Sequence, residues 1–364
     1  LIIGGQGAEF SCRSTSFDEP LTPSNFNMKR ASSQGSAAVQ AVSVDSRGMY
    51  VQRGGTRVFE LAFDGETYDY SSTDLTAIIP EIGEPSIVRM AVQRQPDTRI
   101  HCVRSDGTAA VLIYDKVENV TCWVEVISDG ATGLIEDVMV LPGDPGSNED
   151  QVYYTVKRTI NGTEKRYRER WAMESECWGD LDLCMLADSF VVYQGSAVNT
   201  ITGLSHLEGE QVVVWADGED IGTDANGDLI YTVSSGQITI TGNAVANAVV
   251  GLYYRGRFRS AKLVQCVNDL GIGLNQEKNI ESLGLILANT HAQGIKYGTD
   301  FDHLSNMPGM EEGAPVPEGY VWEDYDQEMF PVDGKWESDS RLCLEMAAPR
   351  PATVLSALIG VTTT

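Results

Sequence analysis

The pattern of apolar and polar positions in the first half of the chain is that of short strands joined by tight turns. In residues 99–115, two apolar runs, Ile100–Val103 and Ala109–Tyr114, flank the dipeptide Asp106-Gly107. An Asp-Gly pair between strand-like runs is a strong hairpin signal, because a type I′ turn needs positive φ at both central residues. We therefore predict a β-hairpin closed by a type I′ turn at this point.

The same hairpin pattern occurs once before and once after this stretch. Gly54-Gly55 and Asn161-Gly162 are flanked in the same way, and the first strands of the three units start about 51 and 52 residues apart. This spacing is in the range of propeller blades. Residues 1–10 resemble the end of one more copy. The predicted strands of the three units are Val39–Val44, Met49–Gln52 and Val58–Phe63; Ile87–Val92, Ile100–Val103, Ala109–Tyr114 and Cys122–Ile127; and Ile135–Leu141, Val152–Val156 and Tyr167–Trp171.

Each unit thus has the pattern of a β-meander, which buries its faces against similar neighbours. The sequence predicts a region of β-propeller-like blades over residues 1–175. Within it, the polar residues 11–35 are interpreted as a loop or a blade-edge crossing, and Asp74–Ile82 as one short helical turn before Pro85. Residues 172–188 break the rhythm and are interpreted as a linker or short helix.

Two further β regions follow. Residues 190–260 predict a small β-sandwich or barrel, since short strands alternate with turns at Asp217-Gly218, Asn226-Gly227 and Ser235-Gly236. Residues 271–364 predict a C-terminal β platform: a long strand, a turn and a return strand, then an extended acidic loop over 305–334. Strands at Leu342–Met346 and Thr353–Ile359 close the chain. The predicted fold class is all-β.

Charge narrows the classes of function. Lys plus Arg is 26 and Asp plus Glu is 52, which gives a formal net charge of −26. Such an acidic chain does not favour a surface that grips nucleic acid by releasing counterions, but it suits one that repels a polyanion. No apolar run reaches the roughly 18 residues of a membrane helix, so no membrane insertion is predicted. The chain begins without Met, inside a strand-like run, and we expect it to be a fragment of a longer polypeptide.

The cysteines and histidines show no spacing typical of a metal or catalytic site. Seven cysteines without a CxxC pair argue against a disulfide framework, which suits folding in a reducing cytoplasm; Cys102 and Cys122 are interpreted as small core residues. His101, His206, His291 and His303 have no metal-ligand spacing, and His291 and His303 are assigned to loops or strand ends. We expect no catalytic residues, no cofactor and no metal.

Two charged clusters remain as candidates for binding. Asp220, Asp224, Asn226 and Asp228 alternate like the start of a calcium loop, but no bidentate Glu follows, and an acidic hairpin turn is the favoured interpretation. Whether Asp224 and Asp228 bind calcium stays open. The main basic cluster contains Lys157, Arg158, Lys165, Arg166, Arg168 and Arg170.

On a strand, Arg166, Arg168 and Arg170 would share one face, because alternate side chains point the same way. We consider them candidate subunit-interface residues that meet an acidic neighbour. Pairing with carboxylates of the same chain is an equally good interpretation. Arg255, Arg257 and Arg259 form a smaller stripe of the same kind.

The order of six segments resembles the nozzle proteins of short-tailed bacteriophages (tail tubular protein B-like) and related phage stabilisation proteins. The resembling segments span nearly the whole chain: Leu21–Asn25, Val51–Asp64, Cys102–Asp115, Thr155–Trp171, Thr200–Gly218 and Gly294–Asp302. The resemblance implies a structural virion protein with a propeller-like domain, located in the tail and assembled in the host cytoplasm as a hexameric ring. It also implies a missing N-terminal portion and provides no catalytic residues.

The sequence thus favours a non-enzymatic conduit for genome ejection. Its partners would be further copies of itself, other tail proteins (adaptor and fibres), and double-stranded DNA that passes without specific binding. The alternative is a tail-associated adhesin that binds or degrades glycans. A glycan-degrading enzyme would need a cleft with paired carboxylates of perturbed pKa, and the many carboxylates of this chain single out no such pair.

Overall fold

The computed structural model describes residues 1–14, 19–66, 68–128, 133–178, 181–224, 227–264, 273, 275–311, 313–317, 319–326 and 329–363. Strands make up 56% and helices 4% of the chain, so the prediction of an almost all-β protein is confirmed. The chain divides into two compact units, at residues 1–128 and 132–171 for the first and 129–131 and 172–364 for the second. Among the described helices, none is both long and apolar enough to cross a membrane.

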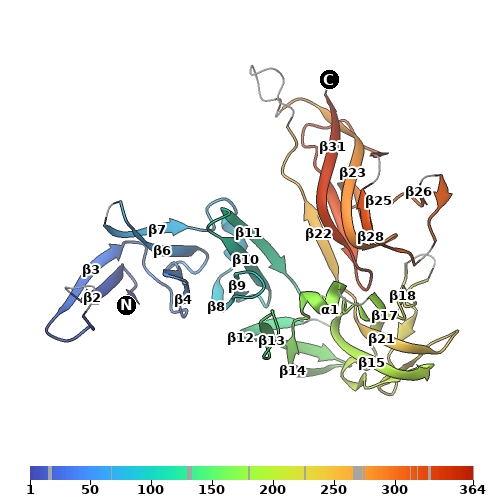
Figure 1. The fold of residues 1–364 in the computed structure, drawn as a ribbon, viewed down its shortest axis with the longest axis horizontal. Helices are drawn as coiled ribbons and strands as arrows, with labels where there is room; N and C mark the ends of the chain where they lie inside the picture. Colours follow the sequence, from blue (N-terminus) through green and yellow to red (C-terminus); the bar gives the residue numbers. More distant parts are fainter. Residues whose placement is uncertain are drawn as a thin grey trace. The chain divides into compact units, whose positions relative to one another are not determined.

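The first unit contains four antiparallel sheets that follow one another along the sequence (Figure 1). In each sheet, successive strands pair with each other, as in a β-meander. The strands of the first two sheets are β1 (Ile2–Gly4), β2 (Glu9–Ser14) and β3 (Phe26–Ser32), then β4 (Val42–Val44), β5 (Arg47–Val51), β6 (Val58–Asp64) and β7 (Asp69–Asp74). Those of the last two are β8 (Ile87–Gln93), β9 (Arg99–Arg104), β10 (Ala109–Asp115) and β11 (Val120–Val126), then β12 (Leu134–Leu141), β13 (Gln151–Ile160) and β14 (Thr163–Arg170).

The four sheets stack face to face. Ala31 of the first sheet packs on Tyr50 and Phe59 of the second. A larger cluster of buried side chains joins the second sheet to the third, with Met49 and Leu112 both fully buried. Another cluster, which includes Val103, Ala109, Val152 and Val156, joins the third sheet to the fourth. Each sheet therefore uses its apolar positions to cover a face of the next, and this burial is the main source of stability for such layers.

Three predictions for the first unit are wrong. Residues 11–35 are not a loop throughout, because β2 and β3 pair there. Cys122 is exposed, since it lies on the last strand of its sheet, whereas Cys102 is fully buried.

The short helical turn predicted before Pro85 is confirmed as the 3₁₀ helix η1 (Pro80–Gly83).

The third incorrect prediction is the turn at Asp106-Gly107. Only Gly107 has a positive φ, of 87°, and the N–H of Arg104 donates to the carbonyl of Thr108. The loop therefore has three residues and ends on a left-handed glycine, which is the other common form of a short hairpin connection. The two-residue turn with positive φ at both positions occurs instead at Asn161 (46°) and Gly162 (70°).

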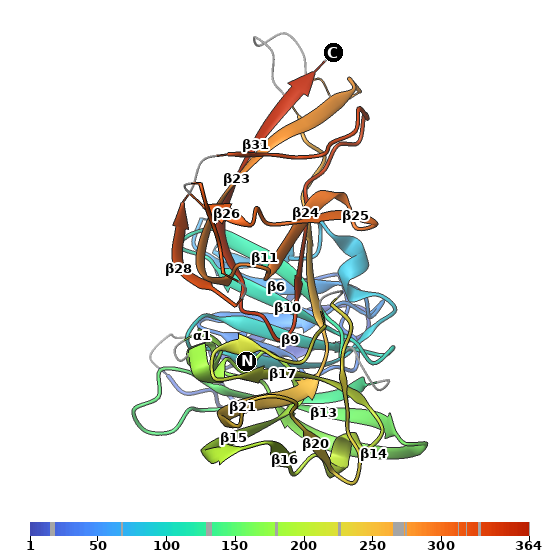
Figure 2. The same cartoon turned by 90° about the vertical axis from the view of Figure 1, so that its right-hand side faces the viewer.

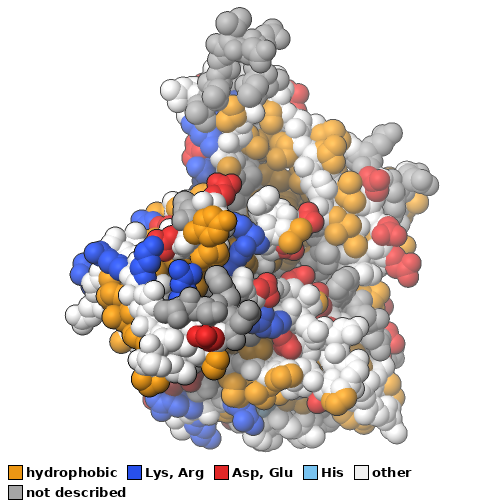
Figure 3. Space-filling model, turned by 60° about the vertical axis from the view of Figure 1, so that its left-hand side comes forward, with side chains coloured by type: hydrophobic (Ala, Val, Ile, Leu, Met, Phe, Trp, Pro, Cys, Tyr) orange, Lys and Arg blue, Asp and Glu red, His pale blue; other side chains and the backbone are white. Residues whose placement is uncertain are grey.

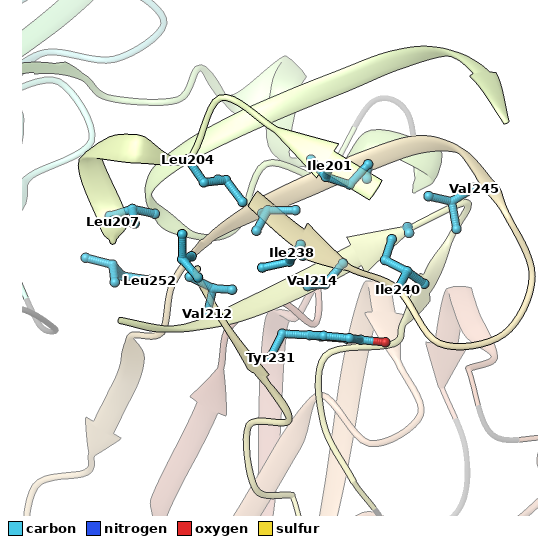
Figure 4. Close-up of a cluster of buried hydrophobic side chains, with 14 residues drawn as sticks. Ile201, Leu204, Leu207, Val212, Val214, Tyr231, Ile238, Ile240, Val245 and Leu252 are labelled. Atoms are coloured by element: carbon cyan, nitrogen blue, oxygen red, sulfur yellow. The ribbon is translucent and has the colours of Figure 1, made fainter. Parts of the chain in front are cut away.

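The second unit begins with short helical segments, α1 (Glu174–Trp178) and η2 (Leu181–Leu183). Antiparallel strands follow, in which β15, β21, β17, β18 and β19 form one sheet and β16 pairs with β20. The strands of this sheet are β15 (Asp188–Val198), β17 (Gln211–Ala216), β18 (Glu219–Asp220), β19 (Tyr231–Thr232) and β21 (Val245–Leu252). The separate pair is β16 (Thr200–Thr202) with β20 (Gln237–Thr239), and the 3₁₀ helix η3 spans Ser205–Leu207. Figure 4 shows the core of this region, whose buried side chains include Ile201 and Ile238, cross-strand partners on β16 and β20, and Val214 of β17.

The C-terminal part of the second unit has two four-stranded sheets and a small hairpin. One sheet has the order β22, β30, β24, β25; in the other, β23 pairs with β28, β29 and β31. The first of these sheets contains β22 (Arg255–Arg259), β24 (Ile295–Asp300), β25 (His303–Asn306) and β30 (Cys343–Ala347). The second contains β23 (Lys278–His291), β28 (Val321–Asp326), β29 (Phe330–Pro331) and β31 (Thr353–Thr363). The hairpin is β26 (Met310–Glu311) with β27 (Ala314–Pro315). Figure 2 shows β23 and β31 side by side as a long ribbon.

Two predictions for this part need correction. The long strand and the turn after it are present, but the return strand β24 pairs with β30 and not with β23. The segment 305–334 is not one extended loop, because β28 and β29 both pair with β23. The predicted closing strands are confirmed as β30 and β31. The strand β22, at the end of the predicted region 190–260, pairs with β30.

Candidate subunit interface

The β13–β14 hairpin carries the basic cluster that the sequence singled out. Its register pairs Arg166 with Lys157, Arg168 with Thr155, and Arg170 with Tyr153. Paired residues of antiparallel strands share a face, so the three arginines lie on one side of the sheet, as alternation predicts. The opposite side carries the buried residues Val152, Tyr154 and Val156, which face the third sheet.

The three arginines differ in their surroundings. Arg166 forms a forked ion pair with Glu136 of β12, with Nε–Oε2 and Nη2–Oε1 distances of 2.6 and 3.0 Å. The Arg166 guanidinium holds the pKa of the Glu136 carboxyl below its usual value. Arg168 lies over the ring of Tyr153, 5.7 Å from its centroid, in a cation–π contact. The intrachain interpretation therefore holds for Arg166, while Arg168 remains exposed above an aromatic ring.

Arg158 belongs to the same sequence cluster but lies on the core side of the sheet. Its side chain is fully buried, and its Nε and Nη2 atoms each lie 2.7 Å from a carboxylate oxygen of Glu169. Such a fork satisfies both groups and gives the pair a fixed geometry. Lys157 pairs with Glu164 at 3.2 Å. The basic cluster is therefore divided between the core side and the outer side of one sheet.

The smaller stripe on β22 is partly neutralised by one carboxylate. Arg257 Nε lies 2.7 Å from Glu345 Oε2, and Arg255 Nη1 lies 3.8 Å from the same oxygen. The guanidinium of Arg257 also lies over the ring of Phe301, at 4.9 Å. On the face shown in Figure 3, basic, acidic and hydrophobic side chains are interspersed and no large field of one sign is formed.

The acidic turn has the contacts of a structural hairpin. The buried Asp220 carboxylate accepts from Arg350 Nε at 2.9 Å and from the hydroxyl of Thr223 at 3.0 Å. The Asp224 carboxylate accepts the N–H of Asp228 at 2.9 Å. Asn226 lies outside the described residues. Within the described parts of the chain, no three His, Cys, Asp or Glu side chains are placed to hold a metal ion.

A buried polar network around His101, between the third and fourth sheets, was not predicted from the sequence. His101 Nδ1 lies 2.7 Å from the hydroxyl of Tyr154, and Nε2 lies 3.1 Å from Gln93 Oε1. The ring also makes an edge contact with Trp171, at 5.2 Å between centroids. Burial lowers the pKa of His101 to about 3. His303 begins β25 and His291 ends β23, in agreement with their assignment to strand ends.

Comparison with known proteins leaves the family of this chain open. No family model matches the sequence. No curated protein matches it either. Among solved structures, the chain has a likeness to one titled "Glycoside hydrolase", with 8% sequence identity over 99% of this chain and 96% of that chain, and a TM-score of 0.24. A TM-score this low carries no argument about function.

Proposed function

We propose that this chain is a structural subunit of a bacteriophage tail, of the nozzle type, which assembles into a ring around the path of the ejected genome. The observation that carries the proposal is the face-to-face stack of β-meander sheets in the first unit. A stack of this kind is how propeller blades pack, and a propeller-like domain is what the six resembling segments imply. The protein acts by assembly and not by catalysis.

The arrangement of the first strands supports the propeller-like interpretation. β4 packs beside β8, and β8 packs beside β12, so the first strands of successive sheets are neighbours. Arg89 of β8 pairs with Asp137 of β12 at 3.4 Å, and Arg94 Nη2 donates to the carbonyl of Ser43 in β4. In a propeller, the first strands of the blades line a common axis in this manner.

Charge supports the role as a conduit. A net charge of −26 on each subunit gives the assembly a negative field, and a negative wall lets double-stranded DNA slide without being retained. The adaptor and fibre proteins of the tail would be its other partners. The particle forms in the host cytoplasm and the protein stays in the virion tail.

The proposal is tested by imaging the purified protein by negative-stain electron microscopy, with glycan hydrolysis assayed on the same sample. We expect closed rings of six copies, with no cleavage of host-surface glycans and no retention of duplex DNA at 150 mM salt. A monomer that cleaves or tightly binds a glycan would overturn the proposal in favour of the adhesin alternative.

A further inference from the structure

In the described parts of the first unit, the two end sheets of the stack each have one face that no other sheet of that unit covers. The three internal contacts are closed by buried side chains such as Phe59, Leu112 and Val156. An outer face that carries apolar side chains like those of the internal contacts would be buried in the same way if another sheet packed against it. The two outer faces therefore show what the stack presents to a partner.

The outer face of the first sheet carries large apolar side chains and one exposed cation, Arg30, which alternates with Met28 on β3. Lys29 pairs with Asp69 of the second sheet, so the residues that alternate with Lys29 point away from the stack. Phe26 and Met28 are 48% and 52% exposed on this side, and Ile3 is 43% exposed. Cys12, the cross-strand partner of Met28, lies on the same face and is only 2% exposed. Several large apolar side chains gathered on one sheet face are typical of a protein-binding surface.

The outer face of the last sheet is apolar on one side and basic on the other. Met139 and Leu141 of β12 are 41% and 42% exposed. Across the strands, Met139 pairs with Tyr153, and Tyr153 pairs with Arg170. Arg168 lies over the Tyr153 ring. This face thus offers an apolar strip, an aromatic ring and cationic groups.

The chemistry of the two faces favours contact between unlike ends. Two copies of the last face would bring Arg168 and Arg170 against their own copies, and such like-charge contact is unfavourable. The strand β3 adds only Arg30 to the first face, so contact between unlike ends brings fewer like charges together. A first face presents aromatic and thioether groups that suit the apolar strip, and Phe26 offers a ring to a guanidinium.

We propose that the outer face of the first sheet of one copy packs on the outer face of the last sheet of a second copy. The inference rests on the proposed function and names the seam by which that ring closes. A contact between unlike surfaces is heterologous, and repetition of a heterologous contact closes a ring when the rotation allows it. The key residues are Phe26 and Met28 on one side, and Met139, Leu141 and Arg168 on the other.

The test uses two variants of the full chain, each with one face disabled, and a matched control. Met28→Asp disables the first face, Met139→Asp disables the last face, and Met310→Asp adds the same charge at a 63% exposed methionine in β26 of the other unit. Circular dichroism melting confirms that each protein is folded. We expect each face variant alone to lose the assembly and run as a monomer, while the control assembles like the wild type.

The decisive sample is an equal mixture of the two face variants, measured by analytical ultracentrifugation. One intact first face then meets one intact last face, so we expect a heterodimer that grows no further. Phe26→Asp with Leu141→Asp should behave in the same way. Rings that form despite both variants would overturn this seam and leave the proposed function standing. Folded variants that fail to pair when mixed would also overturn it, and a wild type that is monomeric throughout would overturn both proposals.

Discussion

The hydroxyl of Tyr154 lies 2.7 Å from Nδ1 of His101, and this bond joins the third and fourth sheets of the stack. Burial raises the pKa of Tyr154, so the phenol stays protonated and donates to the imidazole. The other ring nitrogen then donates to Gln93 Oε1 at 3.1 Å. A fully satisfied polar pair inside an apolar contact fixes the register of the two sheets without leaving an unpaired group.

Removal of the Tyr154 hydroxyl should therefore destabilise the protein. In Tyr154→Phe, the buried Nδ1 of His101 loses its partner, and an unsatisfied buried acceptor costs about 1–3 kcal/mol. Tyr153→Phe is the matched control, since that hydroxyl contacts only the side chain of Gln151 in the described structure and lies on the outer side of the same strand. Urea unfolding followed by tryptophan fluorescence checks the difference. Equal midpoints for the two variants would contradict the account.

The same histidine should make stability depend on pH. The pKa of His101 is lowered from 6.5 to about 3 in the folded protein, so below pH 6.5 the unfolded state binds more protons and stability falls. Between pH 7 and pH 5 the loss from this group is about 2 kcal/mol, since each pH unit contributes about 1.4 kcal/mol once the unfolded histidine is charged. His101→Phe should show a correspondingly shallower dependence. If the stability of the variant depends on pH as steeply as that of the wild type, the pKa of His101 is not lowered in the folded protein.

Gly107 is a second position where a single change has a clear consequence. Its φ of 87° disfavours any residue with a side chain, and an added Cβ would meet the side chain of Leu134 at 2.7 Å. Gly107→Val should lower stability by about 2 kcal/mol or more. Gly54→Ala is the control, because Gly54 is not at positive φ and a Cβ there meets no atom within 4 Å. A Gly107 variant that melts at the wild-type temperature would contradict the turn geometry.

In the second unit, the ion pair between Arg350 and Asp220 joins segments 130 residues apart in sequence. The Asp220 side chain is only 3% exposed, so Arg350→Ala leaves a buried carboxylate without its cation. Breaking a buried pair in this way costs about 3–5 kcal/mol. Arg341→Ala, which breaks the more exposed pair with Asp339, should cost much less, because water screens the two charges. Thermal melting of the two variants distinguishes them, and equal losses would refute the structural role of Asp220.

The sequence predicts the strands whose positions depend on local alternation and on turn residues. The strands of the three meanders follow from alternation and turn residues, as in β9, β10 and β13. The strand β3 was not predicted, because most of its side chains are exposed and its sequence shows little apolar alternation. The pairing of β24 with β30 could not be predicted, since partners far apart in sequence leave no mark on the local pattern.

The same limit applies to the charged residues. Alternation alone places Arg166, Arg168 and Arg170 on one face. The partner of Arg166 could not be foreseen, because Glu136 lies at a bulge on another strand, where the register of β12 against β13 shifts. The network of His101 was missed for a similar reason, since Tyr154 lies 53 residues away in sequence.

The central claim is that this acidic chain works as a ring of identical copies. Its most direct test is native mass spectrometry of the purified protein over a range of concentrations and salt. The account predicts a dominant species of six times the 39.6 kDa chain mass, with mass loss in steps of one subunit on activation. A monomer at every concentration, or a closed dimer as the largest species, would contradict it.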